Sequence, residues 1–576
     1  MNKTKFRKSI LENLNDIYAY NLSSKEIKVL AEKIITLNGE RKKLKRKSLS
    51  QSDILLITYA NTIVEKKKRS FLVLEKFLKK YVKKAFSIVH ILPFYPASSD
   101  GGFSVIDFFK IDERHGNWND ISKLAKDYML MVDIVLNHGS RQSEWFKNFV
   151  KDKGKGKDFY FYLDKYQKLN HVVRARSHKL LQRIQTRRGV KYLWCTFSPD
   201  QVDFNYENPE VLIMFLKIIK YILNKGPLVF RLDAIAFLWK RIDSDCINLD
   251  QTHAIVRLIR TFIENINANS LLITETNLPF HENLSYFGNS DEAHGIYNFT
   301  LAPLIINTLI KGDSSALNRW SMGVPPARKR NYYINFLATH DGLGLRPLEG
   351  ILKTKELKKL VACLKSFGSK FTYRKKNKEA LIYEANITLS NALSGTIKGK
   401  DDFLLERYLS AHSILLSFEG IPAIYIHSLF GTRNDIELYN KTKIKRSLNR
   451  HIYEYKDIAN MLEDKTSVTS RIFDKLLNLI EIRKKQKAFH PNATQYTLNL
   501  GKSFFGVWRQ SNDRKQSIFA ISNITNRKSF LELGLINIIK TDSWFDLLTK
   551  KQIVIEKNKL LFQPYQTIWI TNILTD

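Results

Sequence analysis

The sequence predicts an α/β fold whose main domain is a closed (β/α)8 barrel, because short apolar runs alternate with helical periodicities along most of the 576 residues. The runs are rich in branched apolar residues and lack polar alternation, which is typical of parallel strands buried on both faces. Eight such runs are the number that a closed barrel requires. The expected strands are residues 54–60, 87–94, 129–136, 228–233, 271–276, 296–300, 332–339 and 422–427.

Two of the connections between these strands are too long to be simple crossovers. An insertion of residues 139–205 follows the third strand, and an insertion of residues 342–421 follows the seventh. Long excursions of this kind usually form functional lids or small subdomains. Other connections carry helical periodicity, as in residues 209–226, where Gly226 is expected to end the helix.

The two ends of the chain differ from its middle in pattern. Residues 1–50 predict a helical N-terminal extension that ends in the basic, solvated run GERKKLKRKSLS. Residues 489–576 contain short alternating runs, which predict a small C-terminal antiparallel β domain. The catalytic TIM barrel, with both insertions, is therefore expected to span residues 51–488.

The composition indicates a folded protein that acts in a reducing compartment. Apolar residues make up 44% of the chain and aromatic residues 12%, which is enough for a large core. No stretch has the length and apolarity of a transmembrane helix or signal peptide, so we expect no membrane partner. Only three cysteines occur, Cys195, Cys246 and Cys363, and their spacing predicts neither disulfides nor a zinc site. A cytoplasmic location is expected.

The net charge of +37 raises the question of an anionic partner. The lysines are spread along the whole chain beside many Asn, Ile, Phe and Tyr residues, which is typical of a compositional bias and not of a binding patch. We therefore expect no nucleic-acid partner. A positive field that attracts a small anion such as phosphate is compatible with this charge.

Four of the expected strands end on a carboxylate or a His-Asp pair. The segments are MLMVDIVLNH, LVFRLDA, LLITET and NFLATHD. Polar side chains at the C-terminal ends of barrel strands converge on one mouth, so Asp233, Glu275 and Asp341 should meet in one pocket. A single acidic residue at such a position is most often a helix cap or a loop residue. Three together are the equipment for cleaving a glycosidic bond.

The order and spacing of these segments resemble the four signature regions of glycoside hydrolase family 13, the α-amylase family. Within it, the stretch HILPFYPASSDGGFSVIDFFKIDERHGNW and the fragment RNDIELYNKTKIKRSLNRH are similar to the sucrose phosphorylase subfamily. The segments FLATHDGLGLRPLEG and YEANITLSNALS are most similar to glucosylglycerate phosphorylases. Sucrose phosphorylases tend to have Gln where this chain has Glu384.

The resemblance implies a role for each catalytic carboxylate. Asp233 is expected to be the nucleophile that forms a covalent glucosyl-enzyme. Glu275 is expected to be the general acid and then the base, with a raised pKa. Asp341 is expected to bind sugar hydroxyls and stabilise the transition state. Arg231 lies two residues before Asp233, hence on the same strand face, and should hold the nucleophile ionised.

The same resemblance implies a set of glucose-binding side chains. Asp100 would shape a blind glucose subsite, and His138 and His340 would donate hydrogen bonds to glucose hydroxyls. Asp133 and Asn137 are expected to be structural. The alternatives of ordinary core histidines, and of a simple ion pair for Arg231, stay open.

Three further residues are candidates for phosphate and acceptor binding. Arg446 matches the phosphate-contacting arginine of the subfamily, Arg346 would meet an acceptor carboxylate, and Glu384 would belong to the acceptor site. Each is alternatively an ordinary loop residue. No metal is expected, because the phosphorylase branch generally lacks the calcium site that Asn137 supports in related amylases. No nucleotide cofactor is expected, since the chain has no phosphate-binding glycine motif.

The sequence therefore predicts a retaining phosphorylase that transfers glucose from a small α-glucoside to phosphate, with glucosylglycerate the favoured donor. Sucrose and sucrose 6'-phosphate are alternative donors, and a transglucosidase or hydrolase of the same family is an alternative activity. A catalytically inactive binding protein is disfavoured, because no member of the carboxylate set is missing. The expected partners are the sugar and inorganic phosphate, and the expected assembly is a monomer or homodimer.

Overall fold

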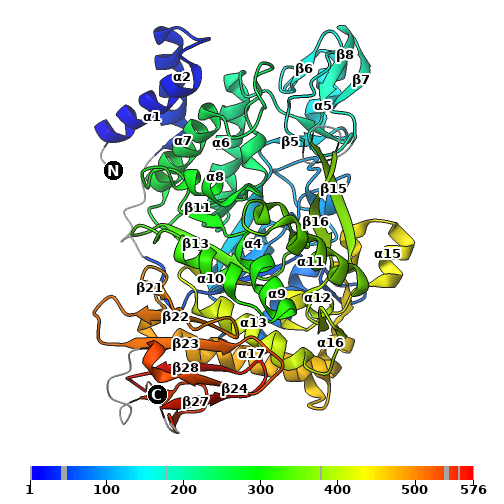
Figure 1. Cartoon of the computed structure of the whole chain (residues 1–576). Helices are drawn as coiled ribbons and strands as arrows, with labels where there is room; N and C mark the ends of the chain where they lie inside the picture. The colour runs from blue at the N-terminus through cyan, green and yellow to red at the C-terminus, as the bar shows by residue number, and fades with distance from the viewer. Residues whose placement is uncertain are drawn as a thin grey trace.

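A closed parallel barrel forms the centre of the protein (Figure 1). The computed structural model describes residues 3–39, 48–82, 84–174, 176, 178–376, 379–536, 544–554 and 558–574. Within these residues eight strands close in the order β1-β19-β13-β12-β11-β10-β4-β3. Their bounds are β1 Leu55–Thr58, β3 Ile88–Ile91, β4 Met129–Ile134, β10 Val229–Leu232, β11 Leu271–Thr274, β12 Gly295–Tyr297, β13 Tyr332–Phe336 and β19 Ile421–Tyr425.

Each barrel strand falls inside, or within one residue of, one of the eight apolar runs, and the predicted fold class is confirmed. Nearly every strand residue is buried, which explains why the runs show no polar alternation. The sixth strand differs most from its prediction. β12 ends at Tyr297 instead of Thr300, and the side-chain amide of the next residue, Asn298, donates to Asn335 Oδ1 at 3.0 Å.

Helices cover the outside of the barrel. They include α3 (Ser70–Phe77), α4 (Trp118–Asp127), α6 (Pro209–Asn224), α7 (Asp250–Ile266), α9 (Leu301–Lys311) and α13 (Leu404–Ser417). Asn208 caps α6 by accepting from the backbone N–H of Glu210, and Pro209 stands in the first turn. Gly226 follows the end of α6 with φ +119°, where a Cβ would lie 2.6 Å from Ala125 Cβ.

Both long insertions fold into small β-containing units. The first contains β5 (His138–Ser140), α5 (Glu144–Lys151), β6 (Tyr162–Leu163), β7 (Leu181–Thr186), β8 (Gly189–Trp194) and β9 (Gln201–Asp203). The second contains β14 (Leu343–Gly344), α11 (Thr354–Ser366), β15 (Lys370–Lys376) and β16 (Glu379–Asn386), and its strands pair in the order β14-β16-β15. β14 starts two residues after Asp341, so this sheet is attached directly to the barrel mouth.

The N-terminal region forms two helices, α1 (Lys3–Tyr18) and α2 (Ser24–Asn38), which pack on α7 and α6. Ser23 and Glu26 form a capping box that starts α2. Asn38 ends this helix and donates to the Phe262 carbonyl of α7 at 2.8 Å. Most of the basic run expected to be a solvated linker, residues 40–47, lies outside the described residues.

The C-terminal region forms an antiparallel sheet below the barrel (Figure 1). In its described part six strands run in the order β21-β22-β23-β28-β25-β26. They are β21 Thr494–Thr497, β22 Phe504–Gln510, β23 Ser517–Asn523, β25 Phe545–Asp546, β26 Lys551–Gln552 and β28 Thr567–Thr571, and β24 Ser529–Glu532 pairs separately with β27 Lys559–Phe562. The apolar run KLLFQPYQTIWITN forms two strands, β27 and β28, because Pro564 lies in the turn between them.

None of the helices in the described part of the chain is long and apolar enough to cross a membrane. All three cysteines are buried and unpaired.

Candidate active site

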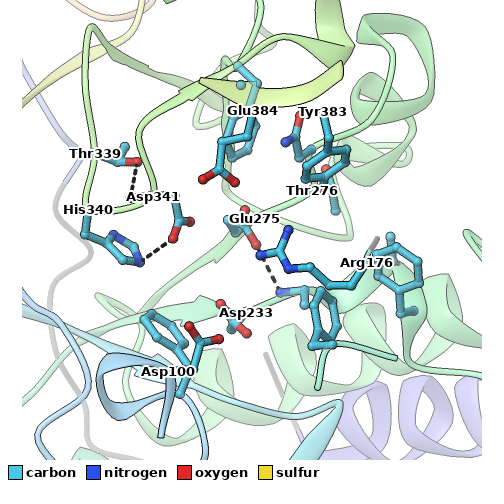
Figure 2. A pocket seen from close by; sticks show the side chains of 18 of the residues that line it. Asp100, Arg176, Asp233, Glu275, Thr276, Thr339, His340, Asp341, Tyr383 and Glu384 are labelled. Carbon is cyan, nitrogen blue, oxygen red and sulfur yellow. Dashed lines mark hydrogen bonds and ion pairs between the residues drawn. The ribbon is translucent and has the colours of Figure 1, made fainter. Parts of the chain in front are cut away.

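A polar pocket of about 780 Å³, measured with its open mouth, lies at the C-terminal ends of the barrel strands. Eight of the ten predicted site residues line it: Asp100, His138, Asp233, Glu275, His340, Asp341, Glu384 and Arg446. Figure 2 shows that the carboxylates of Asp233, Glu275 and Asp341 face the same space. The remaining two, Arg231 and Arg346, lie directly behind the lining residues.

Asp233 stands at the end of β10 and is held from behind by Arg231. The Arg231 Nη1 donates to Asp233 Oδ1 at 2.8 Å and also to Asp133 Oδ1. Asp133 in turn accepts from His90 Nε2 at 2.7 Å. Because these groups come from neighbouring strands β10, β4 and β3, the barrel itself fixes the orientation of the Asp233 carboxylate.

Glu275 follows β11 and lies next to Asp233. Its Oε2 accepts from the backbone N–H of Ala234 at 3.1 Å and lies 3.6 Å from Arg231 Nη2. Ala234 adopts φ +49°, a left-handed conformation that costs energy for a residue with a side chain and is concentrated at functional sites. One guanidinium and one strained turn thus connect the two carboxyl groups.

The electrostatics of this pair favour one shared proton. Burial raises the pKa of both carboxyls. A negatively charged neighbour raises each pKa further: Glu275 raises that of Asp233, and Asp341 raises that of Glu275. Arg231 opposes both shifts, but its contact is 2.8 Å to Asp233 and 3.6 Å to Glu275. The closer guanidinium contact therefore favours the ionised form of Asp233 more than that of Glu275.

Asp341, at the loop after β13, is the carboxylate with the strongest cationic neighbours. Arg446 Nη1 lies 2.8 Å and Arg450 Nη2 3.6 Å from Asp341 Oδ1. Although burial opposes ionisation, these guanidiniums hold the pKa of Asp341 well below its usual range. Asp341 is therefore charged at all physiological pH values.

His138, Gln201 and Asp100 form a connected wall of the pocket. The side-chain amide of Gln201 lies 3.2 Å from Asp100 Oδ2 and 3.0 Å from His138 Nε2. Burial lowers the pKa of His138 to about 4, so its imidazole is neutral. Asp100 adopts φ +53° in the loop after β3, which turns its carboxylate to the pocket.

His340 lines the pocket beside the loop that carries Asp100. Its ring stacks on Phe103, with centroids 5.1 Å apart and planes 5° apart, and its Nε2 lies 3.4 Å from Asp341 Oδ1 (Figure 2). Burial lowers the pKa of His340 well below its ordinary value. Both ring nitrogens are buried, and neither has a hydrogen-bond partner of good geometry among the described residues.

Two arginines, Arg446 and Arg176, line the pocket among its carboxylates. Arg446 spans Asp341 and Glu384, whose Oε2 lies 3.2 Å from its Nη2, and also lies 3.5 Å from Asp100. Arg176 reaches the mouth from the first insertion, with its guanidinium 5.8 Å from the Tyr383 ring centroid.

Arg346 lies behind the mouth and does not itself line the pocket. Its Nη1 donates to the carbonyl of Asn277, a lining residue, at 3.3 Å, while its Nε is buried without a partner.

Asn137 is held by a buried ammonium group. Lys240 Nζ donates to Asn137 Oδ1 at 2.7 Å and lies 2.8 Å from Asp203 Oδ2. The Asn137 amide in turn donates to Asp203 at 2.9 Å. In the described part of the chain, no cluster of three or more His, Cys, Asp or Glu side chains is suited to a metal ion.

Comparisons with known proteins agree with this geometry. The family of the α-amylase catalytic domain matches residues 76–334. A glucosylglycerate phosphorylase of Allomeiothermus silvanus is 37% identical over 98% of both chains. The chain belongs to the α-amylase family. A glucosylglycerate phosphorylase of Escherichia coli K12 is 34% identical over 98% of this chain and all of its own.

The fold is shared with a solved phosphorylase structure. The crystal structure of sucrose 6F-phosphate phosphorylase from Thermoanaerobacter thermosaccharolyticum is similar at a TM-score of 0.73 and 25% identity, over 83% of this chain and 95% of that one. The region matched by the family includes Asp233 and Glu275, whereas Asp341 lies just beyond its end.

Several lining residues were not predicted from the sequence. Gln201 lies in the fragment QVDFNYENPEV, which is similar to the subfamily, so its position carried a usable signal. Arg176 carried none, because only the folding of the first insertion brings it to the mouth. Tyr383, in β16 of the second insertion, and Phe237, in the turn after β10, likewise line the pocket and were not predicted.

Proposed function

We propose that this protein is a retaining α-glucoside phosphorylase that transfers glucose from glucosylglycerate to inorganic phosphate and yields α-glucose 1-phosphate. The observation that carries the proposal is the pocket itself, in which the three carboxylates of Asp233, Glu275 and Asp341 line one space together with the guanidiniums of Arg176 and Arg446. The near full-length similarity to two glucosylglycerate phosphorylases supports the choice of donor.

In the first step the Asp233 carboxylate attacks the anomeric carbon and the bond to the leaving oxygen breaks. Glu275 gives its proton to that oxygen, so that glycerate leaves and a covalent glucosyl-enzyme remains. Arg231 keeps Asp233 ionised before attack through its 2.8 Å contact. A guanidinium shared by both carboxyls supports the short separation, about 5–5.5 Å, that retaining enzymes use.

In the second step phosphate attacks the glucosyl-enzyme from the vacated side. Glu275, now ionised, takes the proton of the attacking phosphate oxygen, and Asp233 leaves as a carboxylate. Asp341, ionised throughout, stabilises the positive charge that develops on the sugar ring in both steps. Two displacements at one carbon retain the α configuration.

The leaving and the attacking group are both anions, and they occupy the mouth in turn. A single cationic site can therefore serve the glycerate carboxylate and the phosphate. We assign this site to Arg176, which lines the pocket, and Arg346 adds its positive charge from behind the lining residue Asn277. Arg446 is a second candidate for phosphate, although three carboxylates already surround it, Asp100, Asp341 and Glu384.

A donor panel tests the proposal. The enzyme is incubated with glucosylglycerate, sucrose and sucrose 6'-phosphate, each with and without phosphate, and α-glucose 1-phosphate is measured. Phosphate-dependent product from glucosylglycerate is expected. Release of free glucose at a rate that does not depend on phosphate would overturn the phosphorylase assignment. If sucrose were the only donor that gives α-glucose 1-phosphate, sucrose would replace glucosylglycerate as the assigned donor.

A trapping experiment tests the catalytic residues separately. Glu275→Gln incubated with α-glucosyl fluoride, whose leaving group needs no proton, should accumulate a peptide that carries one glucosyl residue on Asp233. Asp233→Asn is the matched control and should carry none. A label on any other residue, detected by peptide mass spectrometry, would refute the assignment of the nucleophile.

A further inference from the structure

The N-terminal helices α1 and α2 lie against the outside of the barrel beside α7 and α6 (Figure 1). They bury apolar side chains there, including Ile10, Leu14 and Ile17, which are fully inaccessible. Such packing alone would mean that α1 and α2 only stabilise the barrel by covering α7 and α6. Their contacts, however, continue from α7 to the loop that carries the nucleophile.

The loop after β10 has two faces. On one face Ala234, Ala236 and Phe237 line the active-site pocket. On the other face Trp239, only 2% exposed, meets Tyr18 and Tyr20. Both tyrosine rings make edge contacts with the Trp239 ring at centroid distances of 6.1 Å. The end of α1 thus supports the back of a loop whose front is the pocket wall.

A second connection runs from α1 to the end of β4. Tyr18 is fully buried, and its hydroxyl donates to the carbonyl of Tyr206 at 3.0 Å. The Tyr206 hydroxyl donates to the carbonyl of Leu136 at 3.0 Å. Leu136 stands two residues before His138, a wall of the glucose pocket.

The two connections meet at Lys240, the residue after Trp239. Its ammonium donates to Asn137 Oδ1 at 2.7 Å, and the Asn137 amide lies 3.2 Å from His138 Nδ1. A displacement of Trp239 would therefore move the loop behind Asp233 and the support of His138 together.

We propose that Tyr18, Tyr20 and Trp239 are positioning residues, and that the N-terminal helix pair belongs to the catalytic scaffold because it holds the loop of residues 234–240 in place. The inference rests on Asp233 as the nucleophile and is independent of the natural donor. It gives the N-terminal extension a function in catalysis. An alternative in which the helices only cover α7 predicts an effect on stability and none on turnover of the folded enzyme.

The test compares variants of the full chain with α-glucosyl fluoride as donor and phosphate as acceptor. Tyr18→Phe keeps the ring and removes the hydroxyl that bonds Tyr206, and Trp239→Leu keeps an apolar side chain and removes the edge contacts. We expect kcat to fall about threefold and about tenfold, with smaller changes in KM, because small displacements at a reacting centre are costly. Hydrogen exchange of residues 232–240 should become faster in both.

Asp16→Asn is the matched control, because Asp16 is on the same helix and pairs with Arg257 of α7 at 3.1 Å, away from Trp239. It should leave kcat and the exchange of residues 232–240 unchanged.

The proposal is overturned if Tyr18→Phe and Trp239→Leu lower the thermal midpoint while kcat and hydrogen exchange match the wild type. If Trp239→Leu does not fold, the same measurements on Tyr18→Phe and Tyr20→Ala decide the question. Tyr20 is 58% exposed. The exchange measurement does not depend on the donor, so its outcome stands apart from that of the donor panel.

Discussion

Arg176 is the residue whose role depends most on tertiary structure. It belongs to the insertion after β4, yet it lines the same pocket as Glu275 and Tyr383 (Figure 2). A guanidinium at the mouth offers donors in a fork that fits a phosphate or carboxylate group. In the proposed reaction its charge binds the anion and takes no part in bond making.

We therefore expect Arg176→Gln to raise the KM for phosphate more than it lowers kcat. A lost charge-assisted hydrogen bond of about 1.5–3 kcal/mol corresponds to an increase of about 10- to 100-fold. Initial rates over a range of phosphate concentrations give both constants. Arg183→Gln, an exposed site in β7 of the same insertion, should behave as the wild type. An unchanged KM for phosphate in Arg176→Gln would remove this residue from the anion site.

The pH dependence of turnover follows from Glu275. As general acid it must carry a proton, and burial with the charge of Asp341 raises its pKa. The rate should therefore fall as the pH rises through that raised pKa. Asp341→Asn removes a negative neighbour, so the alkaline limb of its residual activity should move to lower pH by about one unit. The profile of kcat/KM against pH for both enzymes measures this shift, and a shift to higher pH contradicts the assignment of Glu275.

At the scale of elements, the loop after β3 has to be held in an unfavourable conformation. Asp100, Gly101 and Gly102 all have positive φ, at 53°, 61° and 102°. The clamp that holds this loop is Asp200. Its Oδ2 accepts from the hydroxyls of three serines in the loop: Ser98 at 2.5 Å, Ser99 at 2.5 Å and Ser104 at 2.7 Å.

Asp200→Ala should loosen this loop without touching the sugar. We expect the KM for the donor to rise about tenfold and kcat to change less, because in the proposed mechanism Asp100 binds the glucose ring in both the ground state and the transition state. Ser99→Ala, which removes one of the three hydroxyls, should have a smaller effect in the same direction. Steady-state kinetics at saturating phosphate measure both constants. A donor KM equal to that of the wild type in Asp200→Ala would show that the loop keeps its conformation without the clamp.

The elements that could be predicted are those that a short stretch of neighbouring residues indicates by itself. Each barrel strand is a short apolar run, and Asp233 and Glu275 follow directly on two of them. Strand ends in a barrel share one mouth, so the meeting of these residues needed no knowledge of side-chain packing. Pro564 shows the limit of the pattern, because one apolar run contained two strands.

What could not be predicted depends on packing between distant segments. The Tyr18 and Trp239 rings are separated by most of the first half of the chain, and nothing in either local sequence indicates their contact. Arg346 was predicted for an acceptor carboxylate, but its place behind Asn277 depends on how the second insertion folds. These positions follow from tertiary structure, which a single sequence specifies but does not display.

At the scale of the molecule, two buried arginines meet at the end of α13: Arg509 of β22 joins it to the C-terminal sheet, and Arg483 joins it to the helix α17 (Val468–Lys484). Arg483 donates to the carbonyl of Leu416 at 2.8 Å, and Arg509 donates to the carbonyl of Ser417 at 2.7 Å. Both carbonyls belong to the last turn of α13, where helical partners are missing. The adjoining residue Glu419 is 7% exposed, and its Oε1 accepts from the Ala327 N–H at 2.7 Å.

Glu419 should make the stability of the whole protein depend on pH. Burial, opposed by Arg509, raises its pKa from 4.5 to about 7, so the folded state holds this proton more tightly than the unfolded state. The contribution of protonated Glu419 to the free energy of unfolding is complete below pH 4.5 and is lost as the pH rises to about 7. The loss amounts to about 3 kcal/mol at 1.36 kcal/mol per pKa unit. Glu419→Gln keeps an oxygen for Ala327 and cannot ionise.

Urea unfolding at pH 5 and pH 8 measures this effect. The free energy of unfolding of Glu419→Gln should exceed that of the wild type at pH 8 by up to about 3 kcal/mol, and the two should agree more closely at pH 5. Glu113→Gln, at an exposed loop position, should follow the wild type at both values. If Glu419→Gln is less stable than the wild type at pH 8, Arg509 stabilises the ionised carboxylate more than burial disfavours it, and folding lowers the pKa of Glu419 instead of raising it.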